Sequence, residues 1–198
     1  MTKRLFDLLA SLLALSVLAP LLLLIALAIR LDSPGPALFR QQRVGLHGRI
    51  FRIHKFRTMF VDAERSGPTL TPGGDPRITP VGAFLRRHKL DELPQLIDVV
   101  SGDMSIVGPR PEVPRYVALY PPDVRQIVLS VRPGITDAAS VAYRDEGAAL
   151  ARAADVEQFY VDVILPQKLR LCVEYVRNRS LPGDLRIVAR TLAALVRS

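Results

Sequence analysis

The chain has 198 residues, of which 49% are hydrophobic, and it carries a formal net charge of +8. This length suits one globular domain with or without an appended segment, and the basic balance favours anionic partners such as phosphates, nucleotides or an acidic membrane face. The single cysteine, Cys172, excludes an intrachain disulfide and is predicted to be a small core residue. The three histidines, His47, His54 and His88, lack the spacing of a zinc site.

Residues 5–29 are almost entirely apolar and form the first predicted element. As one straight helix they would extend about 37 Å, enough to cross a hydrocarbon core of roughly 30 Å. Pro20 lies within the run, and proline removes a backbone donor and clashes with the preceding turn. If the helix breaks there, arms of about 22 Å and 14 Å are each too short to cross. This predicts a re-entrant helix–break–helix hairpin over residues 1–31, which enters and leaves the membrane on one side.

The flanking charges favour the hairpin over a crossing helix. Lys3 and Arg4 precede the apolar run, and Arg30 and a series of basic residues over 40–57 follow it. Positive residues near membrane segments stay cytoplasmic, so a crossing helix would violate this rule at one end. A single span stays open as an alternative. A cleaved signal peptide is a third, since residues 26–28 (Ala-Leu-Ala) resemble a cleavage site, but the long apolar run and the basic residues after it disfavour cleavage.

The remainder, 32–198, is predicted to be a mainly helical α/β body that forms the catalytic domain. Aromatic and β-branched residues around a glycine-containing connector predict a β-hairpin with strands over 37–44 and 49–57. Residues 66–76 form a loop, either a mobile lid or an inert surface segment. Further helices are predicted over 81–89, 113–119, 122–130, 148–178 with a break at Pro166, and 185–196. The last is amphipathic and basic, which suits either the membrane surface or the core.

Two adjacent carboxylates, Asp91 and Glu92, stand out in this basic chain. An apolar stripe over 93–100 ends at Gly102 and predicts a helix for which Asp91 is the N-cap. Of two neighbouring carboxylates at the start of a helix, one can act as a nucleophile while the other binds a metal ion. Nearby cations are expected to lower the carboxylate pKa values and keep Asp91 ionised. For an isolated Asp-Glu pair, a simple helix cap is the commoner explanation.

Basic residues on constrained backbone strengthen the catalytic interpretation. Lys55 and Arg57 are at i and i+2, on one face of a predicted strand. Arg110 lies between two prolines and Arg132 directly precedes one, so both are held on restricted backbone, as a phosphate clamp requires. Arg86 belongs to a basic cluster just before the carboxylates. Each alone is equally explained by a surface ion pair, but together they favour a polyphosphate ligand.

At this point an ordered series of motifs resembles the bacterial sugar transferase family, the small monotopic phosphoglycosyl transferases. The motifs cover nearly the whole chain: Lys3–Asp7, Asp32–Pro36, Gln42–Gly45, Lys55–Met59, Leu90–Gln95, Gly102–Pro111 and Arg132–Thr136. The resemblance implies transfer of a sugar 1-phosphate from a UDP-sugar to a polyprenol phosphate (undecaprenyl phosphate), with release of UMP. It also implies a bacterial inner-membrane protein on the cytoplasmic face, active in the first membrane step of glycoconjugate or exopolysaccharide assembly, and it leaves a homodimer open.

The resemblance further implies roles for individual residues. Asp91 would form a covalent phosphosugar intermediate, and Glu92, with Asp91, would be associated with Mg²⁺. The residues predicted to bind substrate phosphates are Lys55, Arg57, Arg86, Arg110, Arg132 and Arg144. The chain departs from the family pattern after Thr136, where many members have Gly and this chain has Asp137. Contacts to the sugar or nucleotide are expected to differ there.

Two rival functions stay open. One is a non-catalytic, membrane-anchored binder of anionic lipid or nucleic acid, although no aromatic stacking platform or helix-turn-helix pattern supports a nucleic-acid partner. The other is a metal-dependent phosphatase that hydrolyses a UDP-sugar without a lipid acceptor. The sequence does not determine which UDP-sugar is used.

Overall fold

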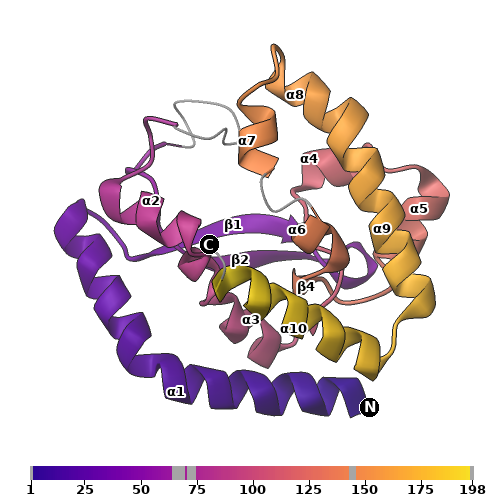
Figure 1. Ribbon diagram of the computed structural model, residues 1–198, viewed down its shortest axis with the longest axis horizontal. Helices are drawn as coiled ribbons and strands as arrows, with labels where there is room; N and C mark the ends of the chain where they lie inside the picture. Colours follow the sequence, from indigo (N-terminus) through magenta and orange to yellow (C-terminus); the bar gives the residue numbers. More distant parts are fainter. Residues whose placement is uncertain (1, 64–69, 71–74, 143–145, 197–198) are drawn as a thin grey trace.

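The computed structural model describes residues 2–63, 70, 75–142 and 146–196. It is mainly helical with two small sheets, which confirms the predicted class (Figure 1). In chain order the elements are α1 (Thr2–Asp32), β1 (Leu38–Val44), η1 (Leu46–Gly48), β2 (Ile50–Phe56), α2 (Pro80–Arg87), η2 (Leu90–Glu92), α3 (Gln95–Ser101), β3 (Ser105–Val107), α4 (Pro114–Val117), α5 (Pro122–Val128), β4 (Gly134–Thr136), α6 (Ala138–Ala142), α7 (Glu146–Leu150), α8 (Val156–Phe159), η3 (Tyr160–Ile164), α9 (Leu165–Asn178) and α10 (Leu181–Val196).

The predicted β-hairpin is present. β1 and β2 pair antiparallel from Leu38 opposite Phe56 to Val44 opposite Ile50. A second sheet, in which β3 and β4 run parallel, was not predicted. Its strands are only three residues long, too short for a periodic pattern. A Cβ atom on Gly134 would lie 2.1 Å from the Gly108 nitrogen, so only glycine permits this approach of the two backbones.

The apolar N-terminal segment is one helix, α1, and the predicted interruption at Pro20 is absent. Figure 1 shows instead that α1 bends between two arms, one along the lower edge of the molecule and one rising towards α2. Pro20 lies inside the helix and cannot donate to the carbonyl four residues earlier. A helix that loses one such hydrogen bond kinks and continues when the remaining turns are well formed.

The first arm of α1 is attached to the globular body by polar side chains. Arg4 donates to the carbonyls of Val99 (2.6 Å) and Val100 (3.1 Å) at the end of α3. The buried Asp7 carboxylate accepts from the Ser105 hydroxyl at 2.7 Å. These contacts satisfy the free carbonyls at the C-terminal end of α3 and join α1 to β3.

The second arm is attached by apolar packing. Ile25 and Ile29 are buried against Phe56 of β2 and Leu85 of α2. Both ends of α1 therefore contact the same globular body.

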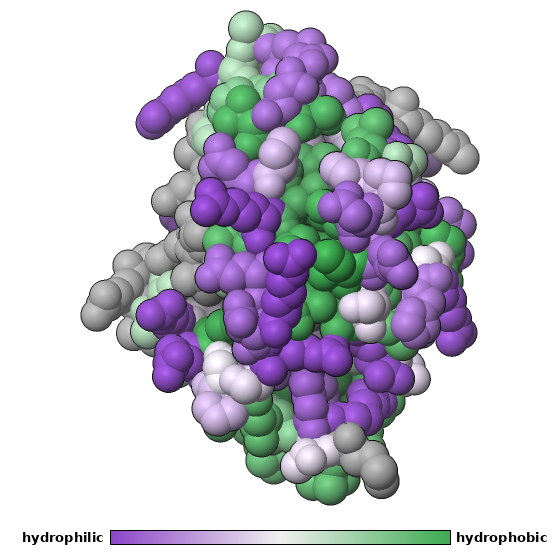
Figure 2. Space-filling model, turned by 90° about the vertical axis from the view of Figure 1, so that its right-hand side faces the viewer, coloured by the Kyte–Doolittle hydropathy of each residue, from purple (hydrophilic) through white to green (hydrophobic). Residues whose placement is uncertain are grey.

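Along most of its length α1 presents an apolar surface. Its exposed large hydrophobic residues are Leu5, Leu9, Leu12, Leu13, Val17, Leu21, Leu23, Leu24, Leu27 and Leu31. By length and composition, the helix is able to cross a membrane. Figure 2 shows hydrophobic residues gathered at the lower edge, the level at which α1 runs in Figure 1. An exposed apolar surface of this extent is typical of a membrane contact.

The C-terminal half forms the largest hydrophobic core, between α4, α5, η3 and α9. The predicted helix 148–178 is divided into α7, α8, the π-helical turn η3 and α9, so the placing of its break at Pro166 was wrong. The interruption lies over 151–155, where Asp155 caps α8 by accepting from the Gln158 nitrogen at 3.0 Å. Pro166 sits in the first turn of α9, where its missing N–H is not needed. Cys172 is buried in this core, as predicted.

Helix α10 packs against α6, β3 and β4. Its buried Asp184 accepts from Lys3 at 2.6 Å and from the Tyr175 hydroxyl at 2.8 Å, while Leu185 and Leu192 stay exposed. The helix therefore contacts the core and also keeps apolar residues at the surface.

Candidate active site

Asp91 and Glu92 lie in η2, a single 3-10 turn, and not at the N-cap of a long helix. The preceding Lys89 has a left-handed backbone (φ 55°), and α3 begins only at Gln95. No side chain caps η2 or α3, so the predicted cap role of Asp91 was wrong. Pro94 precedes the first residue of α3, where its missing N–H leaves no helical hydrogen bond unmade. The two carboxylates are therefore presented by a short turn.

Glu92 is neutralised by two cations. Arg110 donates to both carboxylate oxygens, to Oε2 at 3.0 Å and to Oε1 through its other nitrogen, and Lys55 Nζ lies 3.1 Å from Oε1. Burial alone would raise the pKa of Glu92, but Arg110 and then Lys55 outweigh it and hold that pKa well below its usual range. Burial lowers the pKa of Lys55, and the charge of Glu92 opposes this effect.

Asp91 behaves differently from its neighbour. Burial raises its pKa, and the adjacent charge of Glu92 raises it further, while Lys55, Arg86 and Arg110 oppose the rise without cancelling it. The cations act in the expected direction, but the expected net lowering of the Asp91 pKa was wrong. The cations pair with Glu92, and within the described part of the chain no donor bonds to the Asp91 carboxylate. The environment thus shifts the pKa values of the two acids in opposite directions, which is typical of paired carboxylates with different roles.

Arg86 is the basic residue on the Asp91 side. Its Nε donates to the Thr58 hydroxyl at 2.8 Å, and the charge of Asp91 partly offsets the lowering of its pKa by burial. Helix α2 can approach Thr58 this closely because Gly82 has no Cβ atom. A Cβ there would lie 2.1 Å from the Thr58 carbonyl oxygen. Arg86 is therefore held beside the carboxylate pair by the packing of α2.

Lys55 is oriented by its neighbour in β2. The Asp98 carboxylate contacts the His54 ring Nδ1 at 2.6 Å and accepts from the His54 backbone nitrogen at 2.8 Å. This double contact fixes α3 against β2, and the adjacent Lys55 then reaches Glu92. No sequence pattern predicts the His54–Asp98 pair, because the two residues come from separate elements.

Arg110 projects from a segment that is itself anchored by a second acid. Glu112 accepts from the Tyr160 hydroxyl at 2.6 Å and lies 3.7 Å from both Arg43 and Lys168. These contacts join the segment to β1, η3 and α9. Sequence reasoning missed Glu112 and Lys168, since the partners are far apart in the chain and share no motif.

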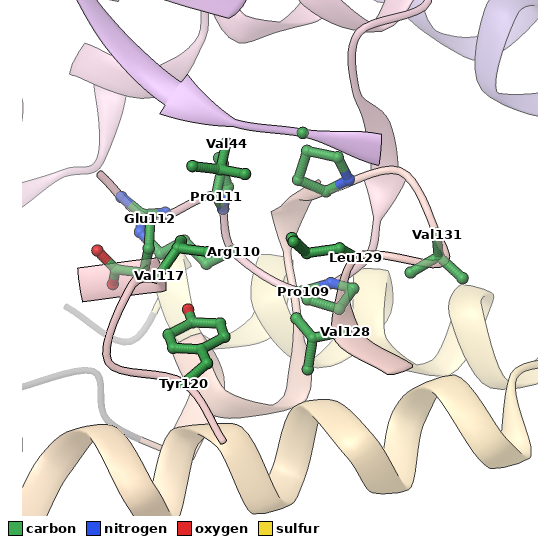
Figure 3. Close-up of a pocket in the computed structure, with 12 residues that line it drawn as sticks. Val44, Pro109, Arg110, Pro111, Glu112, Val117, Tyr120, Val128, Leu129 and Val131 are labelled. Atoms are coloured by element: carbon green, nitrogen blue, oxygen red, sulfur yellow. The ribbon is translucent and has the colours of Figure 1, made fainter. Parts of the chain in front are cut away.

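Figure 3 shows Arg110 and Glu112 on this segment, with Tyr120 and Val128 beneath it. The enclosed space there is about 10 Å³, roughly the volume needed for one water molecule. It therefore belongs to the support of Arg110 and is too small for a substrate.

Arg57 is not brought to the carboxylates. Its guanidinium is buried and donates to the Ser33 carbonyl (2.7 Å), the Ser33 hydroxyl (3.0 Å) and the Pro34 carbonyl, with a longer contact to the Ile29 carbonyl at 3.4 Å. It thus satisfies carbonyl groups at the C-terminal end of α1. Lys55 and Arg57 project to different partners because the strand β2 ends at Phe56, between them.

Arg132 is exposed and donates to the Gly102 carbonyl at 2.8 Å. It lines an open groove of about 450 Å³ with the β1–β2 connector, including His47 and Arg49, and the structure gives it no contact with Asp91 or Glu92. Arg144, and most of the loop predicted over 66–76, lie outside the described residues.

The carboxylate pair could bind a magnesium ion only together with other ligands. The described residues contain no group of three or more His, Cys, Asp or Glu side chains that would hold a metal alone. Mg²⁺ is commonly bound by one or two carboxylates together with substrate phosphates and water. Asp91 and Glu92 supply that number of carboxylates, and the surrounding cations suit a diphosphate.

Comparison with known proteins places this chain in a family. The family model for "Bacterial sugar transferase" matches residues 1–198. The chain belongs to the bacterial sugar transferase family. The clustering of Asp91, Glu92, Lys55, Arg86 and Arg110 thus occurs in a chain that matches the family throughout.

Individual relatives agree with this assignment. The chain is 40% identical, over 98% of its length and 69% of the relative's, to a UDP-glucose:undecaprenyl-phosphate glucose-1-phosphate transferase of Caulobacter vibrioides. It is 35% identical, over 98% of its length and 85% of the relative's, to the exopolysaccharide production protein ExoY of Sinorhizobium fredii. An Escherichia coli protein with the same name as the Caulobacter relative is 38% identical over 96% of the chain, which spans 39% of that protein.

Proposed function

We propose that this chain transfers a sugar 1-phosphate from a UDP-sugar to undecaprenyl phosphate. The observation that carries the proposal is the buried Asp91, to which no donor bonds among the described residues, beside a Glu92 that Arg110 and Lys55 neutralise. The names of the Caulobacter and Escherichia coli relatives supply the substrate classes. Assembly as a homodimer and action in the first membrane step of exopolysaccharide assembly stay predictions.

The chemistry would proceed in two in-line displacements. An Asp91 carboxylate oxygen attacks the phosphorus that carries the sugar, and the bond from that phosphorus to the bridging oxygen breaks, so that UMP leaves with the electron pair. An oxygen of undecaprenyl phosphate then attacks the same phosphorus, and Asp91 departs as a carboxylate. Arg86 and Arg110 would stabilise the charge on the phosphate oxygens in both steps.

Asp91 and Glu92 are the residues that would hold Mg²⁺, completed by substrate oxygens and water. When bound, the ion would neutralise diphosphate charge and stabilise the leaving UMP. Lys55 and Arg110 keep Glu92 anionic, and Mg²⁺ would compete with these two cations for its oxygens. We further propose that Arg110 then contacts the diphosphate as well.

We also propose that α1 is a re-entrant, monotopic membrane anchor that holds the body at the cytoplasmic face. Arg4 near the start of α1 and Ile29 near its end both contact the same globular body, which supports entry and exit on one side. Its exposed apolar surface would face lipid. Cysteine-accessibility labelling at positions 2 and 34 in intact cells should place both on the cytoplasmic side. Labelling on opposite sides would reject the re-entrant topology.

The function is tested by UMP release from a panel of UDP-sugars in membranes with undecaprenyl phosphate and magnesium. A covalent route predicts a burst of UMP from the UDP-sugar alone, before lipid is added. Asp91→Asn should lower turnover by about 10⁴-fold or more while the circular dichroism spectrum is unchanged. The absence of UMP release with every UDP-sugar would favour the non-catalytic binder. Turnover that survives Asp91→Asn would reject Asp91 as the nucleophile, and hydrolysis without lipid would favour a phosphatase.

A further inference from the structure

The tripeptide Pro109-Arg110-Pro111 carries a single backbone donor. Proline has no N–H, so the Arg110 nitrogen is the only group in the tripeptide that can donate from the main chain. That nitrogen donates to Oδ2 of Asp137 at 3.2 Å. Asp137 thus anchors the main-chain nitrogen of Arg110 itself, whereas Glu112 anchors the segment two residues further along.

Asp137 is well placed for this task. It directly follows β4, is 2% exposed, and accepts from the Ser140 nitrogen at 2.6 Å through its other oxygen. The Cys172 thiol lies 3.8 Å from Oδ2. A buried carboxylate held on several sides has little freedom to move, so it can transmit its own position to the residue it anchors.

The other contacts of the segment fall on the residues beside Arg110, among them Arg43, which donates to the Pro111 carbonyl at 3.0 Å. The Gly108 nitrogen donates to the Thr136 carbonyl at 3.1 Å, and the Gly134 nitrogen donates to the Pro109 carbonyl at 3.0 Å. These bonds hold the preceding residues against β4. Within the described residues, Asp137 alone provides a side-chain acceptor to the Arg110 backbone.

Asp137 also acts through charge. Its negative charge stabilises the Arg110 guanidinium, after the larger contribution of Glu92. Arg110 is therefore stabilised by two carboxylates, Glu92 in the candidate active site and Asp137 behind it.

We propose that Asp137 is a positioning residue that fixes the backbone and charge of Arg110, so that its guanidinium is preorganised for the donor diphosphate. This inference rests on the proposed function for the role of Arg110, but not for the anchoring itself. Preorganisation lowers the cost of ordering a binding group when the ligand arrives. Asp137 itself contacts no reacting atom.

The anchoring is measured by hydrogen–deuterium exchange in the full chain in detergent. Because Pro109 and Pro111 have no amide hydrogen, exchange over 109–111 reports Arg110 alone. In Asp137→Ala, exchange at Arg110 should accelerate about 10-fold, the effect of losing one hydrogen bond. Asp137→Asn keeps one acceptor oxygen for two donors, so its exchange rate at Arg110 should lie between those of the unaltered chain and Asp137→Ala. Unchanged protection of Arg110 in Asp137→Ala would overturn the proposal.

The consequence for the site is measured by calorimetric binding of UDP with Mg²⁺. Asp137→Ala should weaken UDP binding about 10-fold, and in an Arg110→Ala background it should add less than about twofold, since the effect passes through Arg110. The matched control is Asp184→Ala, which removes another 2%-exposed aspartate, bonded to Lys3 and Tyr175, and should leave UDP binding unchanged.

An effect of Asp137→Ala on UDP binding that is equal with and without Arg110 would show a general structural role and refute the proposal. The experiments distinguish a failure of the proposed function from a failure of the anchoring role of Asp137. If the unaltered chain neither binds UDP nor releases UMP, the proposed function fails, and the exchange rate at Arg110 still decides whether Asp137 anchors it.

Discussion

Arg57→Ala should destabilise the protein and leave phosphate binding largely intact. The sequence places Arg57 next to Lys55 on a strand and predicts a phosphate-binding role, whereas its buried guanidinium bonds to Ser33 and Pro34 at the end of α1. Removal of the side chain would leave these carbonyls without a donor. The second arm of α1 would then lose its polar attachment to the body.

The size of the effect follows from the contacts. Hydrogen bonds to a charged group contribute about 1.5–3 kcal/mol each, and a buried acceptor left unpaired costs about 1–3 kcal/mol. Ser33 supplies two of these contacts and water will reach part of the vacated space, so we expect a loss of about 3–5 kcal/mol. For a chain of this size, that corresponds to a fall in Tm of roughly 6–20 °C.

Thermal unfolding in detergent, followed by circular dichroism at 222 nm, measures the loss. The matched control is Arg52→Ala, an exposed arginine on β2, the strand that ends just before Arg57; it should change Tm by less than about 2 °C. UDP affinity of Arg57→Ala, measured below its Tm, should stay within about threefold of the unaltered protein. An unchanged Tm together with a tenfold loss of UDP affinity would return Arg57 to the phosphate site and refute the structural argument.

Two further predictions concern the acids around Arg110. Glu92→Gln should lower turnover by about 10- to 100-fold and raise the Mg²⁺ concentration needed for half-maximal UMP release; an unaltered Mg²⁺ dependence would exclude Glu92 as a ligand. Glu112→Gln should cost about 2–4 kcal/mol at neutral pH, because Lys168 and Arg43 lose their buried counter-charge. The folded-state pKa of Glu112 is lowered, although burial alone would raise it, so its contribution is present above about pH 4.5 and is lost as pH falls through the lowered pKa. The Tm difference between Glu112→Gln and the unaltered chain should therefore shrink below about pH 4.5, and a difference independent of pH would contradict this assignment.

Local patterns predicted several elements correctly. The β-hairpin follows from aromatic and β-branched residues around a glycine connector, and α1 follows from a long apolar run. Both signals are contained in consecutive residues. The parallel pairing of β3 with β4 was missed because its strands are short and far apart in sequence, and it depends on the close approach of Gly108 to Gly134.

The sequence predicted which residues form the candidate site better than it predicted what each residue does there. Adjacent carboxylates and constrained arginines pointed to Asp91, Glu92 and Arg110, which the structure brings together with Lys55. The cap role of Asp91 failed because a 3-10 turn intervenes before α3. Arg57 was misplaced because the period of a strand predicts on which face a residue lies, but not which acceptor on another element meets it.

The sequence by itself determined the apolar N-terminal helix, the basic balance and the presence of an adjacent acid pair, since each can be read from the sequence without the fold. The tertiary structure decided which cation meets which acid. Arg110 and Lys55 come from separate elements to neutralise Glu92, which leaves Asp91 with its pKa raised by burial and by the charge beside it. Desolvation and charge pairing depend on distances between distant parts of the chain, and only folding sets those distances.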